Sequence, residues 1–409
     1  MHGHVELKMP TPIIAFSKDF HEDHTSNHHV LRELAKTRRV LWLNSLATRK
    51  PDLKNARDLG KIKRKLTEFS KGAVNVENDL WVATPLVLPL PQSELAQKTN
   101  RQILRFTIQA LRKQLGIKEF QLWTFLPNTA PYVGTLGEDL AVYYCVDEWA
   151  TFPGLDREGT IAMERRLLES VDVTFTTSLA LAEKKRAFCK NTFLSPHGVD
   201  AKKFAQAVDE KLEVPADLAA IQGPKIGFFG TMRDFLDYDL MAYVAKARPE
   251  WQFAFIGQIM SDVSAIKDLP NVHFLGQKKH DELPAYCKGF DIGLIPYRID
   301  NDVKFINPLK LREYLSAGLP VVSTDMPEVQ PYAHLCHIAK TGDEMITAIE
   351  KALTEGSQQE RVARAKAMES ETWQARVAAV TRTVEKFEAR KHQTAHDDLI
   401  GAFPIHAAV

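Results

Sequence analysis

At 409 residues the chain is too long for one small domain, and 44% hydrophobic with 26% charged residues is the composition of a globular protein. A formal net charge of +1 excludes a globally basic nucleic-acid binder. The four cysteines form no CxxC pair, which argues against a disulfide framework or a zinc site and favours buried, reduced thiols in a cytosolic protein: Cys145, Cys189, Cys287 and Cys336.

The first half of the chain alternates short apolar runs with amphipathic segments. It begins with a predicted strand at 12–16, a polar loop at 17–26, a helix at 27–36 and a second strand at 40–44. The series continues with strands at 121–125, 141–145, 173–177 and 192–195, and with helices at 101–115, 163–170 and 179–188. Such alternation predicts a doubly wound α/β domain with a parallel sheet.

A basic stretch interrupts this series. Residues 49–71 carry nine Lys or Arg and three acidic residues, a charge of +6, and an apolar, proline-punctuated segment follows at 84–92. Basic side chains beside exposed apolar ones can hold a peripheral protein on an anionic membrane; a solvated loop and helix face is the alternative. No run of about 18 apolar residues and no apolar signal core occur, so we expect no membrane span.

A loop-like segment at 209–224, ending in Gly223-Pro224, predicts a domain boundary. A second alternating series follows, with strands at 225–229, 252–256, 272–275 and 292–295, and helices at 240–247, 282–288, 342–354, 357–368 and 372–391. We therefore predict two Rossmann-like domains, residues 1–208 and 209–371, facing each other across a cleft at the carboxyl ends of their strands.

The segment from Asn307 to Thr324 carries the clearest site signal. Pro308 favours the start of a helix, Gly318 favours its end, and the apolar residues that follow are typical of a buried strand. The free N–H groups at a helix N-terminus suit a phosphate, and Lys310 adds a positive charge there. With Glu313 on the same helix, the pattern indicates a seat for a nucleotide diphosphate, and a solvated Lys–Glu pair is the alternative.

Five motifs follow one another in this half: GVDAKKF (198–204), FGT (229–231), PNVHFLGQKKHDELPAY (270–286), DIGLIP (291–296) and PLKLREYLSAGLPVV (308–322). In this order they resemble the GT-B glycosyltransferases, the large family that uses nucleotide-sugar donors. The resemblance covers residues 198–380. Trp373 is similar to the start of the family's closing helix, which implies that residues 372–391 return to the first domain.

The first half resembles the family more loosely. His28-His29 with the following LRELAK is similar to the family's first helix. The segment from Tyr143 to Trp149 is similar to one in bacterial exopolysaccharide and teichuronic-type glycosyltransferases, glucuronosyltransferases included.

The resemblance implies a donor site in the second domain. It implies that Lys310 contacts the donor diphosphate and that Glu313 hydrogen-bonds the ribose hydroxyls. The other expected donor-side residues are Gly230, Thr231, Met232, Arg233, Gln258, Tyr297 and Leu309.

Two departures from the family favour an inverting reaction. Common retaining members place a second glutamate eight residues before the position of Glu313, where this chain has Phe305, and the loop at 17–26 contains no glycine. An inverting enzyme needs a base to deprotonate the acceptor hydroxyl. Asp147, which follows a predicted strand, is the first candidate and Glu148 the second. The loop after the first strand is the competing source, with Asp19, His21, Glu22, Asp23 and His24.

We expect no cofactor and no metal, because these histidines lack the spacing of a metal-binding helix and GT-B enzymes generally need no bound metal. The resemblance implies a UDP-sugar donor and a saccharide acceptor. The basic stretch beside its apolar neighbour adds a lipid-linked saccharide to the candidate acceptors, and with it a role in envelope or exopolysaccharide synthesis at the cytoplasmic face of the membrane. A nucleotide-sugar 2-epimerase and a non-catalytic nucleotide-sugar binder stay open as alternatives.

Overall fold

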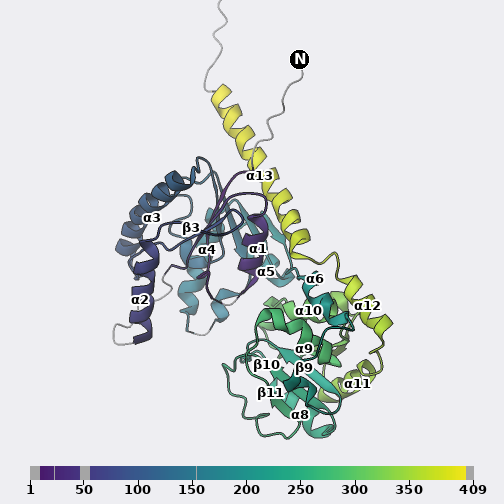
Figure 1. The fold of residues 1–409 in the computed structure, drawn as a ribbon. Coiled ribbons are helices and arrows are strands. Elements are labelled where there is room, and N and C mark those ends of the chain that lie inside the picture. The colour runs from purple at the N-terminus through teal and green to yellow at the C-terminus, as the bar shows by residue number, and fades with distance from the viewer. Residues whose placement is uncertain (1–9, 23, 47–55, 153, 402–409) are drawn as a thin grey trace, which may run out of the picture. The chain divides into compact units, whose positions relative to one another are not determined.

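The chain divides into two compact α/β units. A computed structural model describes residues 10–22, 24–46, 56–152 and 154–401. Unit 1 comprises Met1–Ser195 and Val377–Val409, and unit 2 comprises Pro196–Arg376 (Figure 1). The segment after Ser195 therefore packs with unit 2, whereas the prediction assigned it to the first domain as far as residue 208. The Val199 N–H donates a hydrogen bond to the Glu371 carbonyl (2.9 Å), which fixes this segment beside the end of unit 2.

Unit 1 is built on an eight-stranded sheet in the order β3-β4-β2-β1-β5-β6-β7-β8, in which only β3 runs antiparallel to its neighbour. The strands are β1 (Ile13–Phe16), β2 (Val40–Leu43), β3 (Val74–Glu77), β4 (Leu80–Ala83), β5 (Gln121–Thr124), β6 (Leu140–Cys145), β7 (Val173–Thr176) and β8 (Thr192–Leu194). The central strands are continuous apolar runs because helices cover both faces of the sheet. The chain reverses its winding at β1, so the loops after β1, β5 and β6 lie at the edge where ligands bind in such sheets.

The helices of unit 1 are α1 (Ser26–Leu34), α2 (Ala56–Phe69), α3 (Glu94–Leu115), α4 (Arg157–Ser170), α5 (Leu179–Arg186) and the unit 1 part of α13 (Trp373–Gly401). Short 3-10 turns lie at Pro127–Thr129 and Trp149–Thr151. Val377, Val380 and Val384 form the buried stripe of α13, and Lys391 of this helix pairs with Asp172 (2.9 Å). The predicted return of the C-terminal helix to the first domain is therefore present.

Unit 2 holds a six-stranded, fully parallel sheet in the order β11-β10-β9-β12-β13-β14. Its strands are β9 (Lys225–Phe229), β10 (Gln252–Ile256), β11 (Val272–Phe274), β12 (Ile292–Ile295), β13 (Val321–Thr324) and β14 (His337–Ala339). Numbered within the unit, this is the order 3-2-1-4-5-6 of dinucleotide-binding folds, whose winding reverses between β9 and β12. The predicted α/β class with two mainly parallel sheets is confirmed.

The helices of unit 2 are α6 (Ala201–Phe204), α7 (Ala216–Ala219), α8 (Tyr238–Ala247), α9 (Leu283–Gly289), α10 (Leu309–Ser316), α11 (Gly342–Ala352) and α12 (Gln358–Ala367). Short 3-10 turns lie at Ala205–Val208, His280–Glu282, Val303–Phe305 and Gln330–Tyr332. In the described part of both units, the structure contains no helix that is long and apolar enough to cross a membrane.

Candidate functional site

The strongest candidate site lies at the carboxyl edge of the unit 2 sheet, where Gly230 follows β9. Gly230 has φ +136°, a backbone conformation that favours glycine. A Cβ atom built on Gly230 would lie only 2.6 Å from Lys310 Nζ, so the amine lies directly over this glycine. Lys310 comes from the first turn of α10 and also lies over the Phe228 ring, 5.6 Å from its centroid. Residues far apart in sequence thus bring a positive charge to the sheet edge.

A second glycine makes the close approach of the loops possible. Gly257 follows β10 with φ +142°, and a side chain there would overlap the Gly230 carbonyl oxygen. The Gly230 N–H donates to Ile256 O (2.8 Å), and the Met232 N–H donates to Gln258 O (2.9 Å). The loops after β9 and β10 are therefore held together by their backbones. The first turn of α10 is a separate source of N–H groups for an anion at this edge.

Glu313 lies one turn further along α10 and is 6% exposed. Its Oε1 atom is 3.6 Å from His280 Nε2, and His280 Nδ1 is 3.4 Å from Lys203 Nζ. His280 opens the 3-10 turn after β11, and Lys203 belongs to α6. Neither residue is a predicted site residue, although both lie within motifs that carry the family resemblance.

The remaining predicted donor residues separate into two groups. The side chains of Met232 (0% exposed) and Tyr297 (4% exposed) are part of the core, so they support the loops. The Tyr297 ring packs against Phe235 (4.8 Å between centroids). The residues with at least partly exposed side chains are Thr231, Arg233, Gln258 and Leu309.

A buried polar network behind α10 holds this helix in place. Arg312 is 1% exposed and donates to Asn307 Oδ1 and to the Tyr332 hydroxyl, both at 2.8 Å. The Tyr332 hydroxyl donates to Glu371 Oε2 (2.9 Å), which also accepts from Arg312 Nε (3.3 Å). Because a buried guanidinium is costly unless it is paired, this network fixes the start of α10 and with it Lys310. His197 is buried nearby, and burial together with Arg312 lowers its pKa to about 3.

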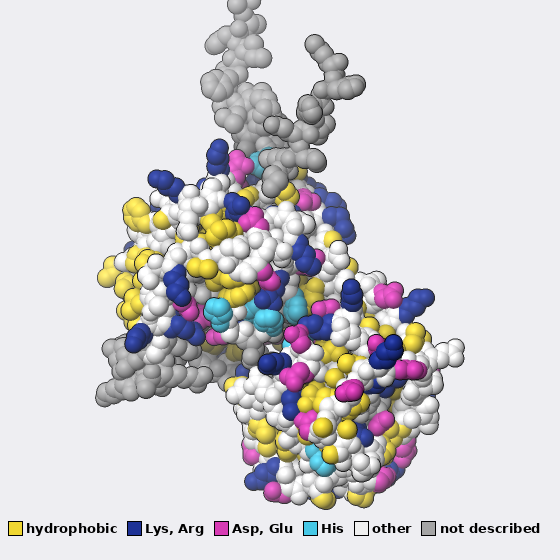
Figure 2. Space-filling view, in the orientation of Figure 1, with side chains coloured by type: hydrophobic (Ala, Val, Ile, Leu, Met, Phe, Trp, Pro, Cys, Tyr) yellow, Lys and Arg dark blue, Asp and Glu magenta, His cyan; other side chains and the backbone are white. Residues whose placement is uncertain are grey.

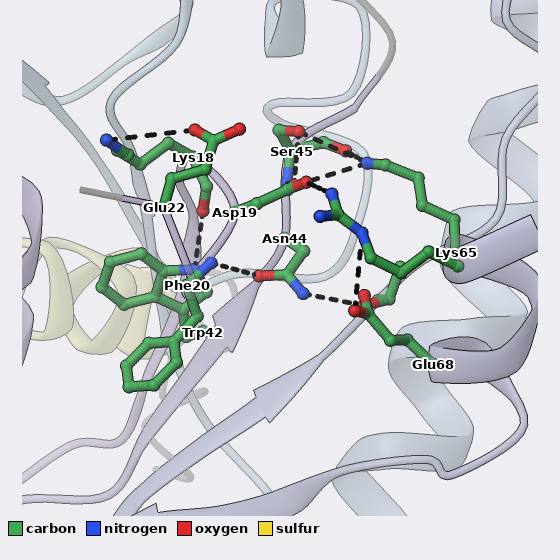
Figure 3. Close-up of polar contacts among 11 residues, drawn as sticks. Lys18, Asp19, Phe20, Glu22, Trp42, Asn44, Ser45, Lys65 and Glu68 are labelled. Carbon is green, nitrogen blue, oxygen red and sulfur yellow. Dashed lines mark hydrogen bonds and ion pairs between the residues drawn. The ribbon is translucent and has the colours of Figure 1, made fainter. Parts of the chain in front are cut away.

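In unit 1, the loop after β1 is fixed by Asp19, which is 7% exposed (Figure 3). Its carboxylate accepts hydrogen bonds from the Ser45 N–H (3.0 Å) and hydroxyl (2.6 Å) and from Arg64 Nη2 (2.7 Å). Burial alone raises the pKa of Asp19, but Lys65 at 3.5 Å, the Ser45 hydrogen bonds and Arg64 outweigh it and lower the pKa. This saturated carboxylate ties the loop to α2, which is a structural role.

The described histidines of this region have different environments. His28 is fully buried; its Nδ1 accepts from the Thr25 N–H (3.2 Å), so Nε2 carries the proton and donates to Phe20 O (2.9 Å). Burial lowers the pKa of His28 to about 4, which keeps it neutral. His21 and His24 are exposed, and His24 stacks on the His28 ring (4.8 Å). Asp23 lies outside the described residues.

Asp147 follows β6 at the same edge of the unit 1 sheet. Its carboxylate is partly buried and makes no hydrogen bond or ion pair with a described residue. Burial raises the pKa of Asp147 to about 7, the value that suits a general base near neutral pH. The backbone on either side is clamped, because Cys145 Sγ donates to Asp147 O (3.3 Å) and Thr177 Oγ1 donates to Val146 O (2.8 Å).

Glu148 has a different environment. Its Oε2 atom pairs with Lys184 (2.9 Å) and with Lys185 (3.1 Å), and Lys185 also pairs with Glu164 (2.5 Å). Burial alone raises the pKa of Glu148, but the two lysines outweigh it and lower the pKa. Between the two candidates of this segment, the geometry therefore favours Asp147 as a base.

No three His, Cys, Asp or Glu side chains come together in a group that could hold a metal ion within the described ranges. The four cysteines are buried and free.

Part of the chain is similar to known proteins. Residues 223–355 match the model of the family described as glycosyl transferases group 1, and this range contains Gly230, Lys310 and Glu313. The chain is 28% identical over 255 residues to TuaH of Bacillus subtilis (strain 168), a protein whose name marks it as a candidate glycosyltransferase of teichuronic acid biosynthesis. The alignment spans 57% of this chain and 63% of that protein.

Solved structures share the fold over nearly the whole chain. Sucrose-phosphate synthase from Thermosynechococcus elongatus superimposes with a TM-score of 0.66 at 15% identity, over 93% of this chain and all of that one (100%). Anabaena HepE, solved in complex with UDP and glucose, gives a TM-score of 0.62 at 11% identity, over 91% of this chain and 98% of HepE. The chain therefore carries a group 1 glycosyl transferase domain and has the two-unit α/β fold of the GT-B glycosyltransferases.

Proposed function

We propose that this chain transfers a sugar from a UDP-sugar to a saccharide or lipid-linked saccharide acceptor in envelope or exopolysaccharide synthesis. The observation that carries the proposal is the position of the Lys310 amine over Gly230, at the N-terminus of α10 and within the matched domain. The UDP in the HepE structure and the teichuronic acid assignment of the Bacillus relative support the choice of donor and of pathway class.

On this proposal, unit 2 holds the donor by its diphosphate and its ribose. The free N–H groups of α10 and the Lys310 ammonium meet the negative charge that grows on the diphosphate as the sugar leaves. Glu313 accepts hydrogen bonds from the ribose hydroxyls. Arg233, partly exposed on the loop after β9, reaches a phosphate or a sugar carboxylate.

Unit 1 supplies the acceptor side. Asp147 takes the proton from the acceptor hydroxyl as it attacks the anomeric carbon, which gives inversion. Its carboxylate is partly buried and has no partner among the described residues, which supports this role, whereas Asp19 and Glu148 are both neutralised by lysine or arginine partners.

We propose that the reaction needs no metal, because Lys310 and the N-terminus of α10 already supply positive charge for the diphosphate. Treatment with EDTA is expected to leave the rate of sugar transfer unchanged within about twofold. A loss of transfer that Mg²⁺ or Mn²⁺ restores would show that a metal carries part of the diphosphate charge.

We also propose that unit 1 contacts an anionic membrane, through a surface that begins in the predicted range 49–92 and continues along α3. Residues 66–106 hold eight of the nineteen large hydrophobic side chains that are exposed in the described part of the chain, and Leu95 (75%) and Phe106 (70%) are the most exposed. Figure 2 shows hydrophobic side chains gathered on the flank that α3 covers. Exposed basic residues interleave with them: Lys63, Lys71, Lys98, Arg105 and Lys113. Residues 49–55 of the basic stretch lie outside the described residues.

The double variant Leu95→Ser/Phe106→Ser is expected to bind phosphatidylglycerol-containing vesicles at least about tenfold more weakly than the wild type, since both exposed anchors are lost. Flotation with vesicles measures this. Leu179→Ser/Val362→Ser is the matched control, because it also removes two exposed large hydrophobic side chains (53% and 48%), both outside this surface. Equal flotation of wild type and Leu95→Ser/Phe106→Ser would contradict the proposed membrane surface.

A thermal-shift screen of nucleotide sugars tests the donor assignment. A UDP-sugar at a hundredfold excess over its Kd is expected to stabilise the protein by about 2.7 kcal/mol. The absence of a shift with every nucleotide and nucleotide sugar would refute the donor site. Conversion of a UDP-sugar to an epimer without acceptor would favour the 2-epimerase alternative, and binding without any reaction would favour a non-catalytic binder.

A further inference from the structure

The linker motif at 198–204 packs against the candidate donor site, although the proposed function gives it no role. α6 is capped by Asp200, whose side chain accepts from the Lys203 N–H (3.1 Å). Phe204 is buried and stacks on Phe229, the last residue of β9, at 6.0 Å and 10°. The edge of Phe204 also meets the His280 ring at 5.7 Å and 84°. The motif therefore packs against the end of β9, directly before Gly230.

A chain of polar contacts runs beside this motif and joins Lys203, His280 and Glu313. Lys203 Nζ is 3.4 Å from His280 Nδ1 and 2.6 Å from Asp281 Oδ1, and His280 Nε2 is 3.6 Å from Glu313 Oε1. An ammonium group can only donate, so Nδ1 accepts and the imidazole proton lies on Nε2. That N–H faces Glu313, and the order of the contacts fixes both the tautomer and the direction of the ring.

The arrangement constrains a carboxylate that is almost fully buried. Among the described residues, the only Lys, Arg or His nitrogen within 4 Å of the Glu313 carboxylate is His280 Nε2. A carboxylate that accepts hydrogen bonds from two ribose hydroxyls must keep one orientation, and the His280 N–H, 3.6 Å from Oε1, favours a single orientation of Glu313. Removing His280 leaves the carboxylate without this partner.

We propose that His280 is a positioning residue of the nucleotide site, which orients Glu313 toward the ribose and is itself held by Lys203. The inference rests on the proposed function, because it needs a nucleotide at α10. It assigns a role to one residue in each of two motifs, GVDAKKF (198–204) and PNVHFLGQKKHDELPAY (270–286), which the sequence singled out only by their order along the chain.

Calorimetric titration with UDP and with 2′,3′-dideoxy-UDP tests this role. The wild type is expected to bind dideoxy-UDP at least about tenfold more weakly than UDP, because the hydrogen bonds to Glu313 are lost. His280→Ala is expected to bind UDP about tenfold more weakly and to lose little further affinity for dideoxy-UDP, since Glu313 is no longer oriented. The glutamine amide can donate in place of Nε2, so His280→Gln is expected to recover most of the preference for UDP over dideoxy-UDP.

His273→Ala is the matched control, because His273 of β11 pairs with Gln252 of β10 (2.8 Å) and, within the described part of the chain, makes no hydrogen bond or ion pair with Glu313. It is expected to bind both nucleotides like the wild type. Suppose that the affinity of His280→Ala falls by the same factor as that of the wild type when 2′,3′-dideoxy-UDP replaces UDP. His280 then does not act through Glu313, and the inference is overturned while the donor site stands. If the wild type binds no UDP at all, the proposed function fails and the role of His280 fails with it.

Discussion

Lys310→Ala is expected to lower the rate of sugar transfer by about 10²- to 10³-fold, the cost of removing one preorganised group that meets developing charge. Lys310 is held over Gly230 by the start of α10, which the buried Arg312 network fixes in turn. The ammonium is therefore in place before the diphosphate leaves and needs no reorganisation during the reaction. The loss is expected mainly in kcat, because the charge on the leaving group grows in the transition state.

Steady-state kinetics with the UDP-sugar found in the screen measures this effect. Lys246→Ala is the matched control, because this lysine is exposed on α8 and outside the candidate site, and it is expected to keep the wild-type rate. Gly230→Ala is expected to lower the rate of sugar transfer as Lys310→Ala does, because the new Cβ atom would take the space of the Lys310 amine. Transfer by Lys310→Ala within about twofold of the wild type would refute the role of Lys310.

Asp147→Asn is expected to lower transfer by about 10²- to 10⁴-fold, the usual contribution of a general base, and to leave UDP affinity unchanged. The wild-type rate is expected to rise with pH through about 7, because the base must be ionised and burial raises the pKa of Asp147 to about 7. Below this pH the carboxyl is protonated and cannot accept the proton of the acceptor hydroxyl. The asparagine variant is expected to lose this rise.

The pH profile of kcat/KM measures both effects. Glu169→Gln serves as the control, because Glu169 is an exposed carboxylate of α4 that pairs with Arg165 (2.9 Å). Wild-type kcat in Asp147→Asn would exclude Asp147 and direct the search to the loop after β1, where His21, Glu22 and His24 remain candidates.

Most strands along the chain could be predicted from the sequence, because continuous apolar runs bounded by turn residues are typical of buried parallel strands. The order of the strands within each sheet and the short strand β14 were not predicted. The hairpin of β3 and β4 was missed, since its strands lie between a basic helix and a proline-rich segment. One local signal could have revealed it: Asn78, with φ +46°, precedes Asp79 in the turn, and asparagine is typical of such positions.

The contacts around the sites could not be predicted, because their partners are distant in sequence. The sequence offers Asp19 as a candidate base, but Arg64 and Lys65 of the basic stretch neutralise it, a pairing that no local pattern indicates. The ordered motifs predict the position of Lys310. They do not predict the pairing of Glu313 with His280 or of Arg312 with Glu371, because these partners meet only in the folded chain.

Transfer of a radiolabelled sugar tests the central claim most directly. The protein is incubated with the UDP-sugar that stabilises it and with a detergent extract of bacterial envelope lipids and saccharides, and the label and the released UDP are followed together. We expect the label to move to an acceptor with release of one UDP per sugar, and this transfer to be lost in Lys310→Ala. Label that stays on the nucleotide, whether unchanged or as an epimer, would contradict the assignment of this chain as a glycosyltransferase.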